Sequence, residues 1–306
     1  MALNSGWLLV DKHKGITSRN IVNIISKCLK EKKVGHAGTL DPMATGLLAV
    51  AIGEATKSIS VIQGLNKVYE FKLKWGVATD TDDSTGSVIS KSKIRPTKED
   101  IIQVLPKFIG TLNQVPPAYS AIKINGIRSY KLARQNEFIE HKPRMIEIFN
   151  FRLQDYIDED YSTFEVVCSK GTFVRSLARD IGKKLNTEAH IVDLRRTFIG
   201  NFSVENAILL DLSEKLIHSP LILRNIIPLG DVLRVLPSIN LTKEEADKIK
   251  HGQKLSIKSL KHFKKFLEDY PKHKSTKTLY CCSNDLPIAF IEIHKNEIRP
   301  FKVFNV

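Results

Sequence analysis

The segment KKVGHAGTLDPMATG, residues 32–46, carries a single acidic side chain, Asp41, among three glycines. Glycine can adopt positive φ and leaves room for another backbone or a ligand to come close. Pro42 has a fixed φ and favours an extended conformation for Asp41, so the carboxylate is held in a stiff local frame. Two interpretations follow: a turn that closes a loop, which the local pattern alone favours, or a nucleophile or base presented to a bulky ligand. The phosphate-loop pattern G-x-x-x-x-G-K-[ST] is absent.

The overall charge of the chain indicates a polyanionic partner. Lys and Arg number 47 against 33 Asp and Glu, a formal net charge of +14 in 306 residues. Nucleic acid is the leading candidate for that partner, although a lysine-rich proteome would give the same composition. With 42% hydrophobic and 26% charged residues, the chain has the composition of a globular protein and is long enough for two domains.

Cysteine and histidine spacings predict neither a disulfide framework nor a metal site. The four cysteines form no C-x-x-C pair, and the histidines form no H-x-x-x-H or H-E-x-x-H pattern. No apolar run approaches membrane-spanning length, and the apolar patch near the N-terminus is too short for a signal peptide. We therefore expect a cytoplasmic protein without a metal and without a membrane contact.

Hydrophobic periodicity predicts the elements that must position Asp41. Alternation in VYEFKLKW puts four aromatic or large apolar side chains, Tyr69 first, on one face of a strand. Residues 173–185 form an amphipathic helix, with Arg175 at the flank of its apolar stripe, about 100° from Val174. Further expected elements are strands at 6–10 and 162–169, a strand or helix at 46–53, a helix from Thr17 or Ser18 to Cys28, and a helix over 97–112 that opens at Thr97.

A basic segment over residues 116–144 is suited to contact phosphates. It contains six Lys or Arg, among them Lys123, Arg128 and Lys131, against two acids, with tyrosines interleaved. Contacts of this kind supply affinity for a nucleic acid without reading its sequence.

The organisation of the chain changes near residue 236. A short helix with a capping box, Thr242 and Glu245, is followed by three apolar strands with short turns. This order predicts a small β-barrel. The lysine-rich stretch 257–277 fits either a solvated loop, the safer interpretation, or a surface that contacts phosphates.

Five blocks, in order from about residue 6 to 205, resemble the TruB-type bacterial tRNA pseudouridine synthases. They are GWLLVDKHKGITS, GHAGTLDPMATGLLAVAIGEATK, NKVYEFKLKWGVATDTDDSTG, QVPPAYSAIKINGIRSYKLAR, and CSKGTFVRSLARDIGKKL with AHIVDLRR. Members of this family convert uridine 55 in the T-loop of tRNA to pseudouridine. The resemblance implies an α+β fold with a mixed, mainly antiparallel sheet flanked by helices. It implies a catalytic domain over 1–235 with a basic RNA-binding insertion at about 116–146, and a small PUA-like β-barrel over 236–306.

The resemblance also assigns roles to five residues. Asp41 aligns with the catalytic nucleophile, Arg175 with the active-site arginine, and Tyr69 with the tyrosine that stacks on the target base. His36 matches the histidine that occupies the T-loop when the base leaves the stack, and Leu194 matches an apolar residue of the uracil pocket. Without the resemblance, Arg175 fits a rim arginine, Tyr69 and Leu194 fit core residues, and His36 fits an ordinary loop residue.

Partners follow from the same resemblance. The substrate is tRNA, whose target base must leave its stack at a cost of a few kcal/mol, and no cofactor is needed. Lys12, in the first turn, is expected to contact the substrate, although His13 stands where the family commonly has proline. We expect a monomer that acts without a guide RNA. Two alternatives are a tRNA-binding or tRNA-folding protein without catalysis and a guide-RNA-dependent relative, and the long basic insertion disfavours the latter.

Overall fold

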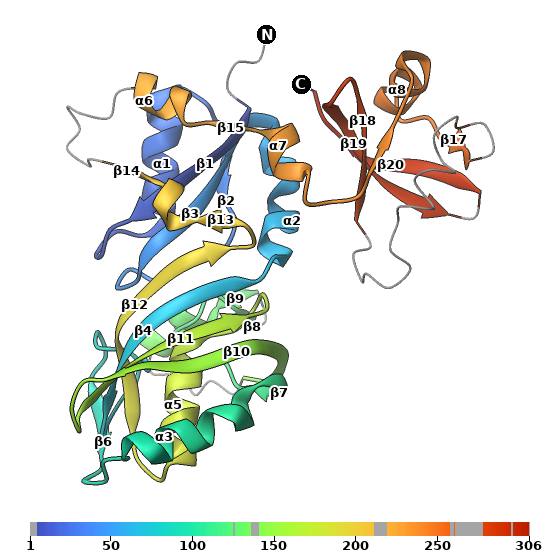
Figure 1. Ribbon diagram of the computed structural model, residues 1–306. Helices are drawn as coiled ribbons and strands as arrows, with labels where there is room; N and C mark the ends of the chain where they lie inside the picture. The colour runs from blue at the N-terminus through green and yellow to red at the C-terminus, as the bar shows by residue number, and fades with distance from the viewer. Residues whose placement is uncertain are drawn as a thin grey trace.

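The computed structural model describes residues 5–124, 126–135, 141–210, 219–257, 260, 278–294 and 296–305. It contains a large and a small β-sheet with flanking helices (Figure 1), and two further two-stranded sheets, β5(Val77–Thr79) with β6(Val88–Lys91) and β8(Lys123–Ile124) with β9(Ile127–Arg128). The large sheet has the strand order β14(Ile208–Leu209), β1(Gly6–Lys12), β3(Thr45–Ile52), β12(Ala189–Ile199), β4(Lys67–Trp75), β11(Tyr161–Cys168), β10(Arg144–Tyr156), β7(Gly110–Gln114). Off this path, β2(Val34–His36) pairs with β3, β13(Phe202–Ser203) with β12, and β15(Ile227–Pro228) with β1. Only the pairs β1–β14 and β3–β12 among these are parallel. The expected α+β fold with a mixed, mainly antiparallel sheet is confirmed.

Helices cover the large sheet where the apolar periodicity predicts them. The helix α1(Ser18–Leu29) begins after Thr17, whose side chain accepts a hydrogen bond from the Asn20 amide. The helix α5(Val174–Lys184) buries its apolar stripe beside β4 and β12. The remaining helices are η1(Gly53–Ser58), α2(Ile59–Gly64), α3(Lys98–Val104), η2(Leu105–Phe108), α4(Ser129–Arg134), η3(Val204–Asn206), α6(Ser219–Arg224), α7(Leu229–Leu233) and α8(Lys243–Lys250). No described helix is both long and apolar enough to cross a membrane.

The side chains on the predicted apolar face of β4 lie in or against the core of the large sheet. Phe71 stacks on Phe164 of β11 with ring centroids 5.3 Å apart, and Trp75 donates a hydrogen bond to Ser162 at 3.1 Å. Tyr69 lies on the same face, toward the other end of the strand, and packs against this core. The packed core therefore fixes the strand that carries Tyr69.

The expected helix over 97–112 is wrong in its second half. Thr97 and Asp100 form the capping box, but α3 ends at Val104 and gives way to the short helix η2. Gly110 then adopts φ +102°, and the chain enters strand β7, which pairs with β10. Pairing with a long neighbouring strand thus overrides the local helical pattern.

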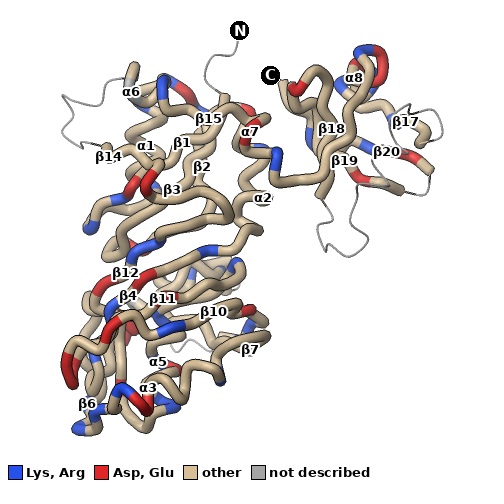
Figure 2. The backbone as a smooth tube through the Cα atoms, viewed as in Figure 1, with Lys and Arg blue, Asp and Glu red and all other residues tan. Residues whose placement is uncertain are grey.

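The C-terminal module is a five-stranded sheet in the order β16(Ser238–Asn240), β18(Leu279–Ser283), β19(Leu286–His294), β20(Glu297–Val303), β17(Leu255–Ser256). The helix α8 begins at the expected capping box of Thr242 and Glu245. The expected small β-structure is present, whereas most of the lysine-rich stretch 257–277 lies outside the described residues. Among the described residues, Lys and Arg occur along the backbone of both modules (Figure 2).

The small sheet is attached to the large one near η1. Lys57 in η1 donates to the carbonyl of Val303 at 2.6 Å, and Glu54 accepts from the Asn305 amide at 2.9 Å. Apolar side chains of the small sheet, Phe290 among them, pack in one cluster with Trp7 of β1. The end of the last strand is therefore anchored beside β3.

A prediction concerns two glycines of positive φ, Gly46 (+98°) and Gly15 (+91°). Alanine at such a conformation costs about 1–2 kcal/mol at either site. A Cβ atom at Gly46 would also overlap the backbone of Arg196 in β12, whereas nothing lies within 4 Å at Gly15. Overlap of this kind adds about 1–3 kcal/mol. We expect Gly46→Ala to lower the urea midpoint of unfolding clearly more than Gly15→Ala; equal losses would contradict the close approach.

Candidate active site

A cleft of about 540 Å³ opens between the glycine-rich loop, the central strands and the start of α5. Four of the predicted residues, Asp41, Tyr69, Arg175 and Leu194, line it. The other lining residues come from 38–40, 144–146 and 169–174, together with Gln63, Lys67, Ser120, Ala121 and Arg196. The structure thus gathers side chains that are far apart in the sequence; Asp41 and Leu194, for example, are separated by 153 positions.

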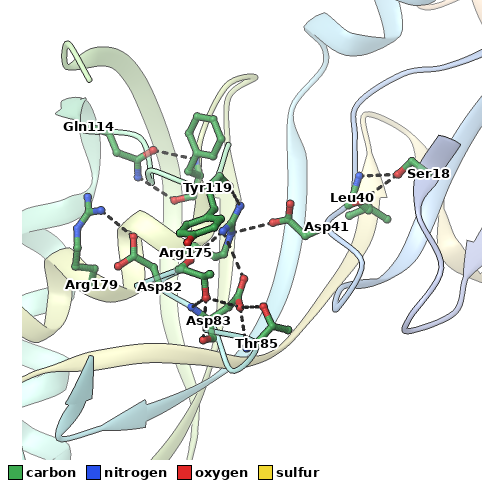
Figure 3. Close-up of polar contacts among 12 residues, drawn as sticks. Ser18, Leu40, Asp41, Asp82, Asp83, Thr85, Gln114, Tyr119, Arg175 and Arg179 are labelled. Carbon is green, nitrogen blue, oxygen red and sulfur yellow. Dashed lines mark hydrogen bonds and ion pairs between the residues drawn. The ribbon is translucent and has the colours of Figure 1, made fainter. Parts of the chain in front are cut away.

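The loop that carries Asp41 is fixed by hydrogen bonds on both sides of the residue. Ser18 at the start of α1 accepts from the Leu40 amide at 2.9 Å and donates to the Leu40 carbonyl at 3.1 Å (Figure 3). The Gly15 amide donates to the carbonyl of Pro42 at 2.7 Å. Asp41 is therefore presented by a backbone that has little freedom to move.

Lys12 stabilises the turn next to Asp41 through hydrogen bonds from its ammonium. Its side chain has no exposed surface, and its ammonium donates to the carbonyls of His13 and Ile16 at 2.9 Å and of Pro42 at 3.4 Å. Burial lowers the pKa of Lys12 to about 8, an effect that Asp41 opposes. The carbonyls of the turn thus surround the ammonium of Lys12, and its expected contact with the substrate stays a prediction.

Arg175 brings a buried guanidinium to Asp41. Its Nε lies 2.9 Å from Oδ2 of Asp41, and its side chain is 6% exposed against 36% for Asp41 (Figure 3). The remaining nitrogens contact Asp83 at 3.4 Å and donate to the carbonyls of Thr81 and Tyr119, both at 2.9 Å. The guanidinium is thus held on several sides, and Asp41 reaches it from the cleft.

Asp83 contacts Arg175, and the sequence did not single it out. It is 3% exposed, and its carboxylate accepts hydrogen bonds from the hydroxyls of Thr81 and Thr85 at 2.8 and 2.6 Å. Its segment, ATDTDDSTG, has the composition of an ordinary polar loop. The sequence feature that could have drawn attention to Asp83 is the run of Thr and Asp around it, because these residues form side-chain-to-backbone hydrogen bonds in turns.

Opposing effects act on the charge of Asp41. Burial raises the pKa of this carboxyl and is the largest effect; Arg175 lowers it, Asp83 raises it, and Lys12 lowers it. The result is a pKa above the ordinary value of 3.8. Because only the ionised carboxylate can act as a nucleophile, the guanidinium of Arg175 favours the reactive form.

Tyr69 and Leu194 form an aromatic and apolar wall of the cleft. Both belong to paired strands, β4 and β12, in which Tyr69 lies opposite Arg196. The guanidinium of Arg196 is 5.9 Å from the centroid of the Tyr69 ring, and its Nη1 donates to the Tyr69 hydroxyl at 3.4 Å. This wall can stack on a planar base from one side.

Arg196 is a second residue missed from the sequence. It is 1% exposed, and it donates to the carbonyls of Leu47 at 2.7 Å and of Gly38 at 3.0 Å. It therefore ties the glycine-rich loop to the strand that carries Tyr69. The block AHIVDLRR could have indicated a buried arginine, because its two arginines follow directly on the apolar positions of a strand.

The other predicted residues lie outside the lining of the cleft. His36 ends β2 opposite Val50, burial lowers its pKa, and its Nδ1 is buried without a partner in the described structure. Lys123, Arg128 and Lys131 are exposed on the hairpin β8(Lys123–Ile124)–β9(Ile127–Arg128) and on α4. Because Ser120 and Ala121 line the cleft just before this hairpin, the basic segment lies at its border.

Known proteins share this chain's sequence over most of its length. Residues 26–174 match the family described as TruB family pseudouridylate synthase (N terminal domain), and residues 175–230 match the tRNA pseudouridylate synthase B C-terminal domain. The tRNA pseudouridine synthase B of Rhodospirillum rubrum is 40% identical over 301 residues, 98% of this chain and 96% of that protein. The chain belongs to the TruB family of pseudouridylate synthases. A second TruB-family relative, from Roseobacter denitrificans, is 45% identical over 248 residues, 81% of this chain and 82% of that protein.

Solved structures share the TruB-family fold at lower identity. A chain in the crystal structure of a Cbf5-Nop10-Gar1 complex superposes with a TM-score of 0.75 at 24% identity, covering 99% of this chain and 86% of that one. A chain of an H/ACA RNP bound to a substrate RNA containing 2′-deoxyuridine gives 0.72 at 22% identity, covering 98% and 85%. These likenesses concern the fold alone, and they confirm the expected pseudouridine synthase architecture.

The electrostatics of Asp41 predict the acid side of the pH profile. The ionised carboxylate is the reactive form and its pKa is raised, so activity should begin to fall at a higher pH than for an ordinary aspartate. Arg175→Gln removes a charge that lowers this pKa, so the pH at which the rate is half of its maximum should move upward. Asp83→Asn removes a charge that raises the pKa, so the same pH should move downward. Single-turnover rates of pseudouridine formation against pH check both signs; shifts in one common direction would contradict this account.

Proposed function

We propose that this chain isomerises uridine 55 in the T-loop of tRNA to pseudouridine. The family and its curated relatives, which are named tRNA pseudouridine synthase B, support the reaction and the substrate. The observation that carries the proposal is the geometry of one carboxylate: Asp41, 36% exposed, lies in a cleft 2.9 Å from the buried guanidinium of Arg175. A nucleophile that must be charged and still reach a substrate needs this combination of access and support.

The reaction is an isomerisation that needs no other reactant. Asp41 attacks the everted uridine at the ribose C1′ or the uracil C6, and the bond between N1 and C1′ breaks. The base turns, C5 bonds to C1′, the bond to Asp41 breaks and returns the carboxylate, the C5 proton leaves, and N1 takes up a proton. Tyr69 and Leu194 pack against the base, and Arg175 favours the ionised form of the attacking carboxylate. Stacking on Tyr69 offsets part of the cost of extruding the base.

Binding of the whole tRNA is assigned to surfaces outside the cleft. We infer a catalytic domain over 1–235, with its basic insertion at about 116–146, and a PUA-like RNA-binding domain over 236–306. Phosphate contacts from both would hold the elbow of the tRNA while a looped-out nucleotide enters the cleft. His36 would occupy the space that the base leaves in the T-loop.

We further infer a cytoplasmic monomer that needs no guide RNA. The curated bacterial relatives, at 36–45% identity, are tRNA enzymes by name, whereas the solved structures of an H/ACA RNP and of an archaeal box H/ACA sRNP complex are similar at 22% identity. Purified protein with an unmodified tRNA transcript and no other RNA tests this point. Product formation is the expected result, and product that forms only after a guide RNA is added would overturn it.

Replacing the nucleophile separates an enzyme from a tRNA-binding or tRNA-folding protein. We expect Asp41→Asn to bind full-length tRNA with affinity similar to wild type, because the carboxylate adds no attraction to RNA. Tritium release from C5-labelled uridine should fall by more than about 10³-fold. Asp193→Asn, an exposed aspartate bonded to Lys14, is the matched control and should keep full activity. Release at the wild-type rate by Asp41→Asn would remove Asp41 from the mechanism.

The basic hairpin predicts a salt effect. Replacing Lys123, Arg128 and Lys131 together by Ala should weaken tRNA binding and flatten the dependence of log Kd on log salt by roughly 0.7–0.9 per lost phosphate contact. Binding is measured at several salt concentrations.

The control for this variant removes three other exposed lysines, Lys91, Lys93 and Lys98, which lie outside the lining of the cleft. It should leave the slope unchanged. An unaltered slope in the hairpin variant would mean that this segment does not touch the RNA backbone.

A further inference from the structure

One part of the cleft, where β10, the turn after β11 and the start of α5 meet, is not used by the chemistry above. Ser120, Arg144 and Lys170 line it. We propose that this part is a subsite for the phosphodiester that flanks the reacting nucleotide. The inference rests on the proposed function, because it takes the bound substrate to be an RNA strand.

The charges that line the cleft are unbalanced. Its cations are Lys67, Arg144, Lys170, Arg175 and Arg196, and its acid is Asp41. Three of the five cations are already engaged: Arg175 with carboxylates, and Lys67 and Arg196 with backbone carbonyls. Arg144 and Lys170 are exposed, and neither side chain has an ion pair or hydrogen bond within the described part of the chain. Two cations therefore remain available to an anion that enters the cleft.

The start of α5 adds backbone donors at the same place. Phe173 gives this eleven-residue helix no side-chain cap, and its first turn has no acidic residue. The amides of a first helical turn have no carbonyl partner within the helix, and the helix dipole there favours an anion. Gly171 precedes it with φ +86°, and no atom lies within 4 Å of where its Cβ would be. The turn is open on the side from which a ligand would approach.

Ser120 gives an independent indication of a missing partner. Its side chain lines the cleft, the residue is 4% exposed, and its hydroxyl is buried with no hydrogen-bond partner among the described residues. A buried hydroxyl without a partner costs free energy, so native proteins seldom retain one without a reason. A phosphate oxygen in the cleft would accept its hydrogen bond.

Hydrogen bonds hold these groups in one frame. Arg144 pairs in register with Gln114 of β7, and the Gln114 side chain accepts from the Phe173 amide at 2.8 Å and donates to the Phe173 carbonyl at 3.1 Å. Ser169 is bonded to the backbone of Glu147 through both its amide, at 2.8 Å, and its hydroxyl, at 2.9 Å. The backbones of β10 and of the turn before α5 are thus fixed to each other, and Arg144 and Lys170 line the same part of the cleft from them.

The anion that fits is a backbone phosphate rather than a free one. A nucleotide whose base lies against Tyr69 and whose ribose lies near Asp41 brings its own phosphodiesters into the remaining part of the cleft. A phosphate oxygen takes hydrogen bonds from a guanidinium, an ammonium, a hydroxyl and helix amides, which are the groups found here. The subsite would then position the ribose for attack.

The test uses T-arm hairpins in which the phosphodiester on either side of the target uridine is replaced, one at a time, by an uncharged methylphosphonate. Equilibrium binding is measured with full-length Asp41→Asn protein, which prevents turnover, with and without Arg144→Ala and Lys170→Ala. For one of the two positions, the neutral linkage should weaken binding about tenfold or more when both cations are present. It should cause no further loss when both have been replaced.

Two outcomes would overturn the subsite. One is equal binding of both neutral hairpins and the natural one when the cations are present. The other is the same additional loss in the variant without the cations, since this would place the phosphate elsewhere. Competition by inorganic phosphate that abolishes the difference at low millimolar concentration would indicate a free-anion site instead. Lys91→Ala with Lys93→Ala, outside the cleft, is the control and should preserve the response to the neutral linkage.

Ser120→Ala separates binding from folding. Removing a buried hydroxyl that has no partner should leave the thermal midpoint equal or higher, while hairpin binding weakens. Loss of stability together with unchanged binding would show a purely structural hydroxyl. Wild-type tritium release is measured in parallel: its absence would refute the proposed function, whereas normal release with no effect of the neutral linkages would refute the subsite alone.

Discussion

The ion pair between Asp41 and Arg175 joins two segments that lie far apart in the sequence and must nevertheless meet within hydrogen-bonding distance. Burial favours the neutral carboxyl, and the guanidinium opposes that effect at 2.9 Å. The guanidinium can do so because Thr81, Asp83 and Tyr119 already hold it in place. The helix α5 carries Arg175, and the loop after β5(Val77–Thr79) carries Thr81 and Asp83, so the positions of these two segments determine the contact. A site arranged in this way needs little reorganisation when charge moves during the reaction.

Tertiary contacts, rather than the Asp-Pro sequence alone, make the loop rigid. Ser18 fixes the backbone before Asp41, and Arg196 holds the carbonyl of Gly38 while its own backbone passes close to Gly46. The glycines therefore have two tasks: they adopt conformations that other residues avoid, and they let β12 come near. Arg196 also donates to the Tyr69 hydroxyl, so the loop that carries Asp41 and the strand that carries Tyr69 are both bonded to this one residue.

Sequence patterns predicted the parts of the fold whose cause is local. The alternation that places Tyr69, the apolar stripe beside Arg175 and the capping box of Thr242 and Glu245 each arise within a few residues, and each is present. The strands β10 and β12 were not foreseen, because their charged residues hide the alternation and their pairing partners are distant in sequence. Asp83 and Arg196 were missed for the same reason: a charged residue is typical of the surface until the fold supplies its partners.

The anchoring of residues 303–305 to Glu54 and Lys57 has a geometric consequence for any large ligand. Both anchor residues follow directly on β3, which itself begins four residues after Asp41. The distance from Asp41 to the small sheet is therefore set by the covalent chain and short hydrogen bonds, with no free linker between them. A folded ligand that touched both places at once would have to match that fixed span.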